Sequence, residues 1–154
     1  MLGSKRQPFK QMTVSDGNNR SKLDKMKETY EKLGLDCLVT LGGAGTHKTA
    51  ALLSSEGCRV IGLPKTIDND IWGTDVTFGF SSAMEIATQC IDRMHSTAAS
   101  HGRTMLVEVM GNKVGWLTLY AGLAGGADMI LIPEIPYDED AVVEFLEKRR
   151  KEGA

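Results

Sequence analysis

Residues 63–79 read LPKTIDNDIWGTDVTFG, a polar segment between an apolar run and a helix-like run. The segment contains Asp68, Asp70 and Asp75, together with threonine and asparagine side chains, a proline and two glycines. Polar segments that follow the strands of an open α/β sheet meet at its carboxyl edge, where such folds bind ligands. Three carboxylates gathered there need a cation, a basic side chain or a proton nearby. The segment therefore predicts either a ligand-binding loop or a solvated surface loop whose Asx turns satisfy its own backbone.

Strand-like and helix-like runs alternate on both sides of this loop. Short apolar runs predict strands over residues 37–41, 59–63, 104–109 and 129–132. Apolar residues at three- and four-residue spacing predict helices over residues 22–33, 46–56, 80–99 and 116–123, and from Asp138 onward. The alternation predicts an α/β fold with a mainly parallel sheet and helices on both faces. Residues 1–20 show no sustained period and predict an irregular arm before a domain over 21–154.

The composition argues against several classes of function. The 154 residues are 42% hydrophobic and 25% charged, and a net charge of −2 gives no basis for a nucleic-acid or membrane-surface partner. No apolar run reaches the roughly 18 residues of a membrane span, and the first residues do not resemble a signal peptide, so we expect a cytoplasmic protein. The three cysteines form no CxxC pair, which favours reduced thiols over disulfides or zinc ligands.

Motifs for metal cages and for nucleophilic hydrolysis do not occur in the sequence. The segment DNDIWG begins at Asp68 like a calcium loop, but its fifth position is Trp72 and its twelfth is Gly79 where a glutamate is needed. The histidines make no HExxH pair, and no serine stands in a GxSxG elbow. Neither chemistry is expected here.

The turn GGAGT, residues 42–46, joins a predicted strand to a predicted helix. Glycines let a phosphate approach the backbone, and a helix N-terminus supplies N–H donors. A tight turn that needs glycine geometry is the alternative interpretation.

Basic side chains in or near the predicted loops are Arg6, Lys48, Lys65, Arg103 and Lys113. Phosphoryl transfer requires cations, backbone amides and a carboxylate base, so the residues alone predict a phosphate-handling α/β domain.

Several motifs, in the same order, resemble the 6-phosphofructokinase family. They are PKTIDNDIWGTDVTFGF (64–80), AASHGRTMLVEVMG (98–111) and GLAGGADMILIPEIPYD (122–138), with LGGAGT and LGSKR upstream. The resemblance covers nearly the whole chain and implies a Rossmann-like, partial phosphofructokinase domain, an internal fragment of its donor-binding part. It implies glycolytic phosphoryl transfer from ATP or pyrophosphate, with Mg²⁺, to the 1-hydroxyl of fructose 6-phosphate. It also implies a homo-oligomer, and we expect the isolated chain to be inactive.

The resemblance also implies roles for individual residues. Asp68 resembles the general base that takes the sugar hydroxyl's proton, Thr66 and Asp70 resemble its partners at the transferred phosphoryl group, and Asp70 resembles a metal ligand. The positions that resemble the donor site are Arg6, Gly42, Gly43, Gly45, Thr46 and Lys65. Those that resemble the sugar-phosphate site are Arg103, Met110, Gly111 and Glu134.

Some positions depart from the family pattern. Ala44 stands where an acidic or amide residue commonly helps to hold magnesium, and a methyl group cannot coordinate it. Asn112 stands where an arginine commonly contacts substrate phosphate. Gly45 resembles the ATP type and Lys65 the pyrophosphate type, so both donors stay open. These departures leave two alternatives, a non-catalytic or regulatory homologue and another kinase with a GGxGT turn, such as an NAD or diacylglycerol kinase.

Overall fold

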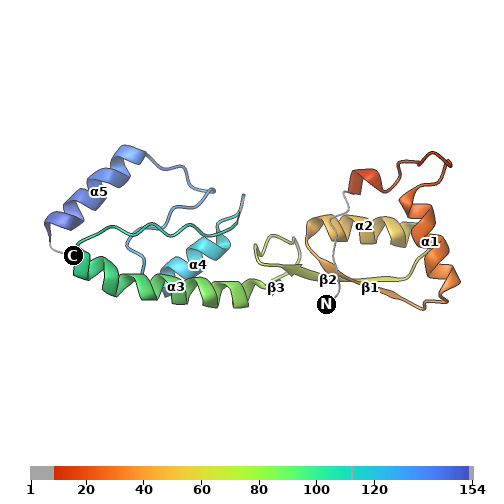
Figure 1. The fold of residues 1–154 in the computed structure, drawn as a ribbon, viewed down its shortest axis with the longest axis horizontal. Coiled ribbons are helices and arrows are strands. Elements are labelled where there is room, and N and C mark those ends of the chain that lie inside the picture. The colour runs from red at the N-terminus through yellow and green to blue at the C-terminus, as the bar shows by residue number, and fades with distance from the viewer. Residues whose placement is uncertain (1–8, 112, 153–154) are drawn as a thin grey trace. The chain divides into compact units, whose positions relative to one another are not determined.

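A computed structural model of the chain describes residues 9–111 and 113–152 (Figure 1). The elements in chain order are η1 (Phe9–Gln11), α1 (Lys22–Lys32), β1 (Leu38–Gly42), α2 (Ala44–Ser55), β2 (Val60–Thr66), β3 (Phe78–Gly79), α3 (Phe80–His101), α4 (Trp116–Ala124) and α5 (Glu139–Lys151). The sheet has the order β1-β2-β3, and β1 pairs with β2 in parallel. The predicted α/β class with parallel strand pairing is confirmed.

The chain divides into two compact units. The first runs to Lys65 and includes Ile71–Thr74, and the second contains Thr66–Asp70 and the chain from Asp75 onward. The predicted division into an arm over 1–20 and a domain over 21–154 stays a prediction.

Helix α1 of the first unit begins at a capping box on Ser21. The Ser21 hydroxyl accepts a hydrogen bond from the Asp24 backbone N–H at 3.1 Å, and Asp24 Oδ2 accepts one from the Ser21 backbone N–H at 2.8 Å. The pKa of Asp24 is lowered, first because the Ser21 hydroxyl donates to its carboxylate and then because the Ser21 N–H does so. Gly34, directly after the C-cap residue Leu33, has a left-handed φ of +60°.

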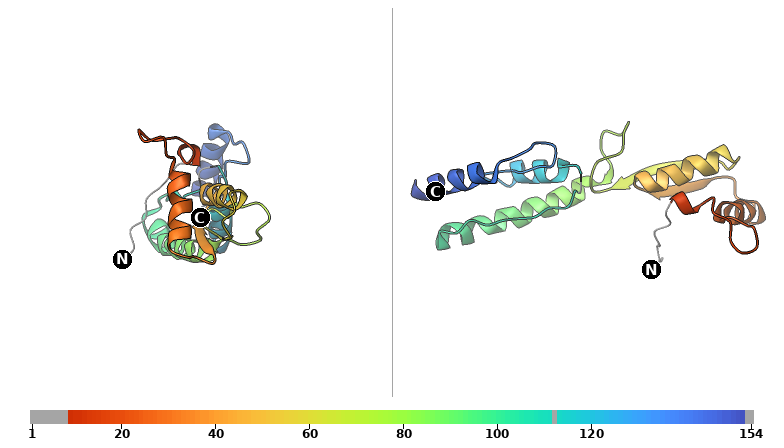
Figure 2. Two further views of the ribbon diagram at one scale, coloured as in Figure 1. Left: turned by 90° about the vertical axis from the view of Figure 1, so that its right-hand side faces the viewer. Right: turned by 90° about the horizontal axis from the view of Figure 1, so that it is seen from above.

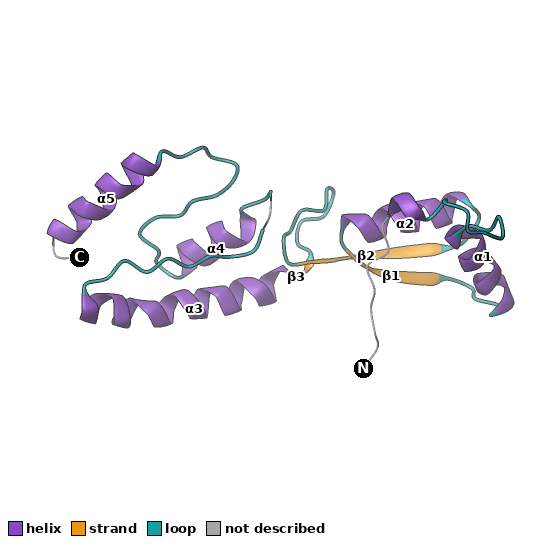
Figure 3. Cartoon of the chain, turned by 45° about the horizontal axis from the view of Figure 1, so that its top comes forward, coloured by secondary structure: helices purple, strands orange, loops and turns teal. Residues whose placement is uncertain are grey.

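The core of the first unit lies where α1 and α2 meet the two parallel strands. Its buried cluster consists of Leu23, Leu53 and Cys58. Figure 3 shows α2 lying along β1 and β2, whose side chains alternate between the two faces of the sheet. The face turned away from this cluster carries apolar side chains that are more than half exposed, namely Val39, Leu41 and Ile61.

Helices α3 and α4 pack against each other in the second unit, as Figure 1 and the right-hand view of Figure 2 show. Ile91 of α3 and Leu117 of α4 are both buried. A Cβ atom at Gly125 would lie 2.8 Å from Ile91 Cγ2, so the missing side chain lets the end of α4 approach α3 closely. His95 Nε2 lies 2.6 Å from the Gly125 carbonyl oxygen, which can only accept, so this nitrogen carries the proton.

Helix α5 begins after Asp138, as predicted, and the Asp138 carboxylate accepts a hydrogen bond from the Asp140 backbone N–H at 3.0 Å. Arg149 of this helix pairs with Asp128 at 2.6 Å.

Among the residues that the structure describes, no helix combines the length and the apolar character needed to cross a membrane.

The predicted strands over 104–109 and 129–132 are wrong. The structure assigns neither segment to a strand, and Leu106 is 93% exposed. A strand exists only through hydrogen bonds to a neighbouring strand, and an apolar run does not specify that neighbour. Several boundaries also shift. The largest changes are that α2 begins at Ala44 rather than Thr46, β2 continues to Thr66 rather than ending at Leu63, and α3 ends at His101 rather than at residue 99.

We predict that Ser21→Ala lowers the free energy of unfolding by about 1 kcal/mol at neutral pH, because the cap of α1 is lost. The effect should shrink in acid. The folded-state pKa of Asp24 lies below its ordinary value of 3.8, so the bond stabilises the fold above that value and is lost as the pH falls through the lowered pKa. Urea denaturation at several pH values measures both effects. Ser54→Ala, an exposed change on α2, is the control and should leave the stability nearly unchanged.

Candidate functional site

Side-chain hydrogen bonds connect the two ends of the loop between β2 and β3 (Figure 3). The Thr66 hydroxyl accepts a hydrogen bond from the Asp68 backbone N–H at 3.2 Å and lies 3.5 Å from Asp68 Oδ2. Asn69 Oδ1 accepts one from the Thr77 backbone N–H at 2.8 Å. The Thr77 hydroxyl donates to the Thr66 carbonyl oxygen, also at 2.8 Å. The Asn69 side-chain amide donates to the Asp75 carbonyl oxygen at 3.4 Å.

The three aspartates of this loop differ in exposure. Asp68 is half-buried, whereas Asp70 and Asp75 are exposed. Asn69, between the first two, has a left-handed φ of +53°, which asparagine adopts more readily than most residues. The loop therefore offers one carboxylate that is fixed by neighbours and partly withdrawn from water, followed by one that solvent reaches.

The aspartates do not form a metal cage. Within residues 9–111 and 113–152, no group of three or more His, Cys, Asp or Glu side chains is placed to hold a metal ion. Mg²⁺, however, is usually bound by one or two carboxylates together with water and substrate phosphates. The exposed carboxylate of Asp70 fits that kind of binding and does not fit a structural zinc or calcium site.

The glycine turn before α2 has no capping side chain. Gly43 is the N-cap, α2 starts at Ala44, and the Gly43 carbonyl oxygen accepts a hydrogen bond from the Thr46 N–H at 2.9 Å. A Cβ atom at Gly42 would lie 2.2 Å from Thr46 Oγ1, whereas one at Gly45 would meet nothing within 4 Å. Gly42 is thus required for the close approach of α2. The helix N-terminus stays accessible beside Gly45, where its backbone N–H groups favour an anion.

His47 lies behind this turn and received no role from the sequence. A Cβ atom at Gly62 would lie 2.8 Å from His47 Nδ1, so the ring packs directly on the backbone of β2. Its Nε2 atom is buried and has no hydrogen-bond partner in the described part of the chain. A lone histidine forms no sequence motif. Gly62, which makes room for the ring, was a possible signal of this contact in the sequence.

Glu134 is held at the start of α4. Its Oε1 accepts a hydrogen bond from the Gly115 backbone N–H at 2.7 Å, and Gly115 is the buried N-cap of the helix. A Cβ atom at Gly115 would lie 2.5 Å from Ile132 Cβ and 2.7 Å from Glu134 Oε2. The helix dipole favours a carboxylate at this position. No motif in the sequence indicated this contact.

The other predicted sugar-phosphate residues are accessible to solvent. Arg103 follows α3 and is exposed, and Met110 is 73% exposed. The Gly111 carbonyl oxygen accepts a hydrogen bond from the Val114 N–H at 3.0 Å and closes a turn. Asn112, at one of the departures from the family pattern, lies outside the described residues.

The predicted site residues are divided between the two units. Gly42, Gly43, Gly45, Thr46 and Lys65 belong to the first, whereas Thr66, Asp68, Asp70, Arg103, Met110, Gly111 and Glu134 belong to the second. The structure joins Thr66 to Asp68 by hydrogen bonding. Among the described residues, no hydrogen bond or ion pair joins Asp68 to Arg103 or Glu134. Arg6 lies outside the described residues.

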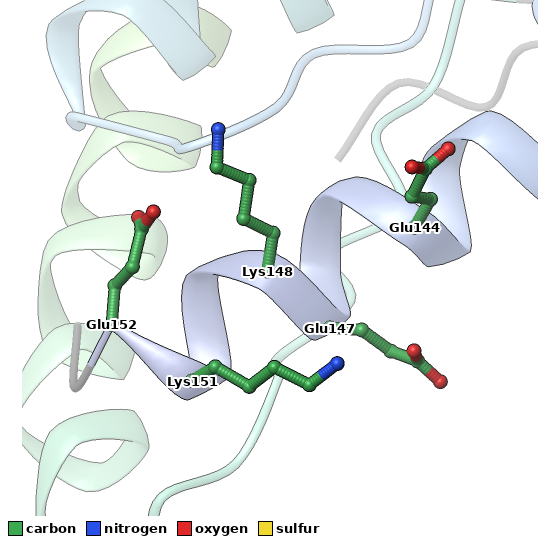
Figure 4. Close-up of a pocket in the computed structure, with 5 residues that line it drawn as sticks. All are labelled: Glu144, Glu147, Lys148, Lys151 and Glu152. Atoms are coloured by element: carbon green, nitrogen blue, oxygen red, sulfur yellow. The ribbon is translucent and has the colours of Figure 1, made fainter.

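Two hollows on the described surface involve other residues. Figure 4 shows one on α5, of about 320 Å³, whose charged side chains extend from the same helix: Glu144, Glu147, Lys148, Lys151 and Glu152. Cations near a helix C-terminus suit its dipole, which explains this basic end without a ligand. The other hollow, of about 280 Å³, borders the core of the first unit and is lined in part by Met26, Tyr30 and Leu53.

Comparison with known proteins identifies a family. The model of the family described as Phosphofructokinase matches residues 1–154. An ATP-dependent 6-phosphofructokinase of Spirochaeta thermophila is 60% identical to the chain and covers 99% of it. ATP-dependent 6-phosphofructokinase 3 of Bacteroides thetaiotaomicron is 51% identical over 99% of the chain.

The chain spans less than half the length of these curated relatives, 43% of the Spirochaeta protein and 45% of the Bacteroides protein. Among solved structures, phosphofructokinase from Saccharomyces cerevisiae aligns with a TM-score of 0.73 at 33% identity. That alignment covers 80% of this chain and 20% of the yeast chain. The fold is therefore shared with part of a larger protein.

We predict that Gly115→Ala lowers the free energy of unfolding by about 1–3 kcal/mol, because a methyl group must displace Ile132 and the carboxylate of Glu134. Thermal denaturation measures the loss. Gly17→Ala is the control, since a Cβ atom at Gly17 meets nothing within 4 Å, and it should leave the midpoint nearly unchanged. Equal midpoints for the two variants would contradict the close packing described at Gly115.

Proposed function

Because this chain belongs to the phosphofructokinase family, we propose that it forms part of an ATP-dependent 6-phosphofructokinase. The reaction transfers the terminal phosphoryl group of ATP to the 1-hydroxyl of fructose 6-phosphate. The observation that carries the proposal is the half-buried Asp68, whose backbone N–H donates to the Thr66 hydroxyl at 3.2 Å. The names of the relatives, which are 60% and 51% identical, support the same activity.

Asp68 acts as the general base in this proposal. Its carboxylate accepts the proton of the sugar 1-hydroxyl as that oxygen bonds to the terminal phosphorus, and the bond from this phosphorus to the bridging oxygen of ATP breaks. ADP leaves with the electron pair of the broken bond. Partial burial keeps Asp68 in place and limits its competing contacts with water. The Thr66 hydroxyl, 3.5 Å from Asp68 Oδ2, orients the carboxylate.

The donor would bind at the glycine turn and the N-terminus of α2. Gly42, Gly43, Gly45 and Thr46 would surround the donor phosphates at the helix N-terminus, with Arg6 and the exposed Lys65 as cations. Asp70 would hold Mg²⁺, which, when bound, neutralises charge on the donor phosphates. The relatives' names favour ATP. Pyrophosphate remains the alternative donor because Lys65 resembles that branch.

Fructose 6-phosphate would bind through the second unit. Glu134 would accept hydrogen bonds from sugar hydroxyls, Arg103 would pair with the sugar phosphate, and Met110 and Gly111 would contact the ring. We also propose a homo-oligomer, in which Arg103 serves a neighbouring subunit's site. A cytoplasmic location agrees with three free cysteines, which are typical of reducing compartments.

A non-catalytic homologue is the second candidate function, and Ala44 favours it. Ala44 is exposed in the first turn of α2, where its methyl group offers no ligand to magnesium. In this candidate the chain would retain sugar-phosphate binding and lack turnover. Activity measurements on the whole protein to which the chain belongs decide between the two.

We predict that Asp68→Asn in the whole protein lowers kcat about a hundredfold or more, because the amide cannot accept the hydroxyl proton. A coupled assay of fructose 1,6-bisphosphate formation with ATP, and separately with pyrophosphate, measures the rate and identifies the donor. Asp75→Asn is the matched control, since its exposed side chain belongs to the same loop and should keep nearly full activity. A fully active Asp68→Asn protein would refute the assigned base.

We predict that Ala44→Asp changes the magnesium dependence of the same reaction. If Ala44 marks lost chemistry in a non-catalytic homologue, the added carboxylate should raise turnover about tenfold or more at limiting Mg²⁺, with Ala44→Asn giving a smaller gain. In an intact ATP-dependent enzyme the rate at saturating Mg²⁺ should stay within about twofold of the unmodified protein. Titration of activity against free Mg²⁺ distinguishes the two results.

A further inference from the structure

Thr77 is the most buried polar residue of the candidate catalytic loop, at 3% exposure, and its backbone and side chain are both hydrogen-bonded. Its hydroxyl donates to the Thr66 carbonyl oxygen at 2.8 Å, and its N–H donates to Asn69 Oδ1 at 2.8 Å. Thr66 in turn bonds to the Asp68 N–H at 3.2 Å. The bonds and the intervening backbone close a ring that contains Asp68.

The ring is anchored on a packed helix. The Phe80 N–H donates to the Thr77 carbonyl oxygen at 3.2 Å, and Phe80, the first residue of α3, is 5% exposed. The Phe80 ring makes an edge-on contact with Tyr120 of α4, with ring centroids 5.7 Å apart. Thr77 therefore connects the end of β2 to an element that is itself held by aromatic packing.

The backbone next to this connection disfavours a side chain at Gly79. Gly79 has a φ of +103°, which strains any residue with a Cβ atom, and such an atom would lie 3.7 Å from the Thr66 carbonyl oxygen. The same carbonyl oxygen accepts the Thr77 hydroxyl. The backbone at Thr66 is thus held by Thr77, and a shift of Thr66 would move the carboxylate of Asp68 with it.

We propose that Thr77 is a positioning residue for the phosphoryl-transfer reaction. It acts through Thr66 to fix the carboxylate of Asp68, and Asn69 holds Thr77 in place. This proposal rests on the proposed function, because it assumes that Asp68 is the base. Misplacing a reacting group by about 1 Å costs on the order of a hundredfold in rate, so a loosened ring should slow the chemical step.

Kinetics on the whole protein provide the first test. Thr77→Val keeps the shape and removes the hydroxyl, and it should lower kcat about tenfold or more while the KM for ATP changes less than about twofold. Thr77→Ser restores the hydroxyl and should recover at least about a third of the rate. Thr88→Val is the matched control, because the Thr88 hydroxyl donates to the Met84 carbonyl oxygen within α3 at 2.9 Å. It should leave kcat unchanged.

A second variant covers the case in which Thr77→Val fails to fold. Asn69→Gly keeps the left-handed backbone and removes the acceptor of the Thr77 N–H. It should lower kcat in the same way, with the KM for ATP again nearly constant. A kcat within about twofold of the unmodified protein, in either folded variant, overturns the positioning role.

Amide hydrogen exchange measures the positioning without turnover. In Thr77→Val, protection of the Asp68 N–H should fall about tenfold or more, while the Leu119 N–H, bonded to the Gly115 carbonyl oxygen at 2.8 Å, should stay protected. Unchanged protection at Asp68 overturns the proposal. If the unmodified protein transfers no phosphoryl group, the proposed function fails. Hydrogen exchange at the Asp68 N–H then decides by itself whether Thr77 holds Asp68 in position.

Discussion

The Thr66 carbonyl oxygen lies where β2 ends, and the hydrogen bond from the Thr77 hydroxyl satisfies it. A typical intramolecular hydrogen bond contributes about 0.5–1.5 kcal/mol, so this part-buried bond stabilises the end of β2. It also fixes the point to which the chain returns after the loop, because Thr77 stands directly before β3 and α3. The loop between the two threonines must then begin and end beside one strand terminus. The position of Asp68 follows from that constraint.

Local signals predicted the elements whose ends are set by their own side chains. Ser21 with Asp24 defines the start of α1, and Asp138 defines that of α5. Such caps need only neighbours in sequence, so a linear pattern contains them. The predicted strands over 104–109 and 129–132 failed because a strand depends on a partner far away in the chain. Their apolar residues satisfied the pattern without supplying that partner.

In the candidate site, too, some features could be predicted from nearby residues in the sequence and others depend on distant contacts. The carboxylates of the loop and the glycine turn could be found from residue types and spacing, and family motifs suggested which carboxylate is the base. The contacts of Thr77, Asn69 and Gly115 could not be found in that way. They depend on an acceptor, a left-handed turn or a close approach that exists only once the chain is folded. Asn69 and Thr77 stood in the quoted stretch with no sign of which residues they would contact.

The unequal burial of Asp68 and Asp70 agrees with two separate tasks. A general base must meet one hydroxyl at a fixed distance, which favours a carboxylate constrained by neighbours and partly removed from water. A ligand of Mg²⁺ must meet an ion that arrives with water and phosphate oxygens, which favours an exposed carboxylate. The left-handed turn at Asn69 stands between them, and the Asn69 side chain binds back to Thr77. Asn69 therefore separates the two carboxylates along the chain, and its bond to Thr77 holds the backbone next to Asp68. The loop can in this way keep two like charges near one site in different surroundings.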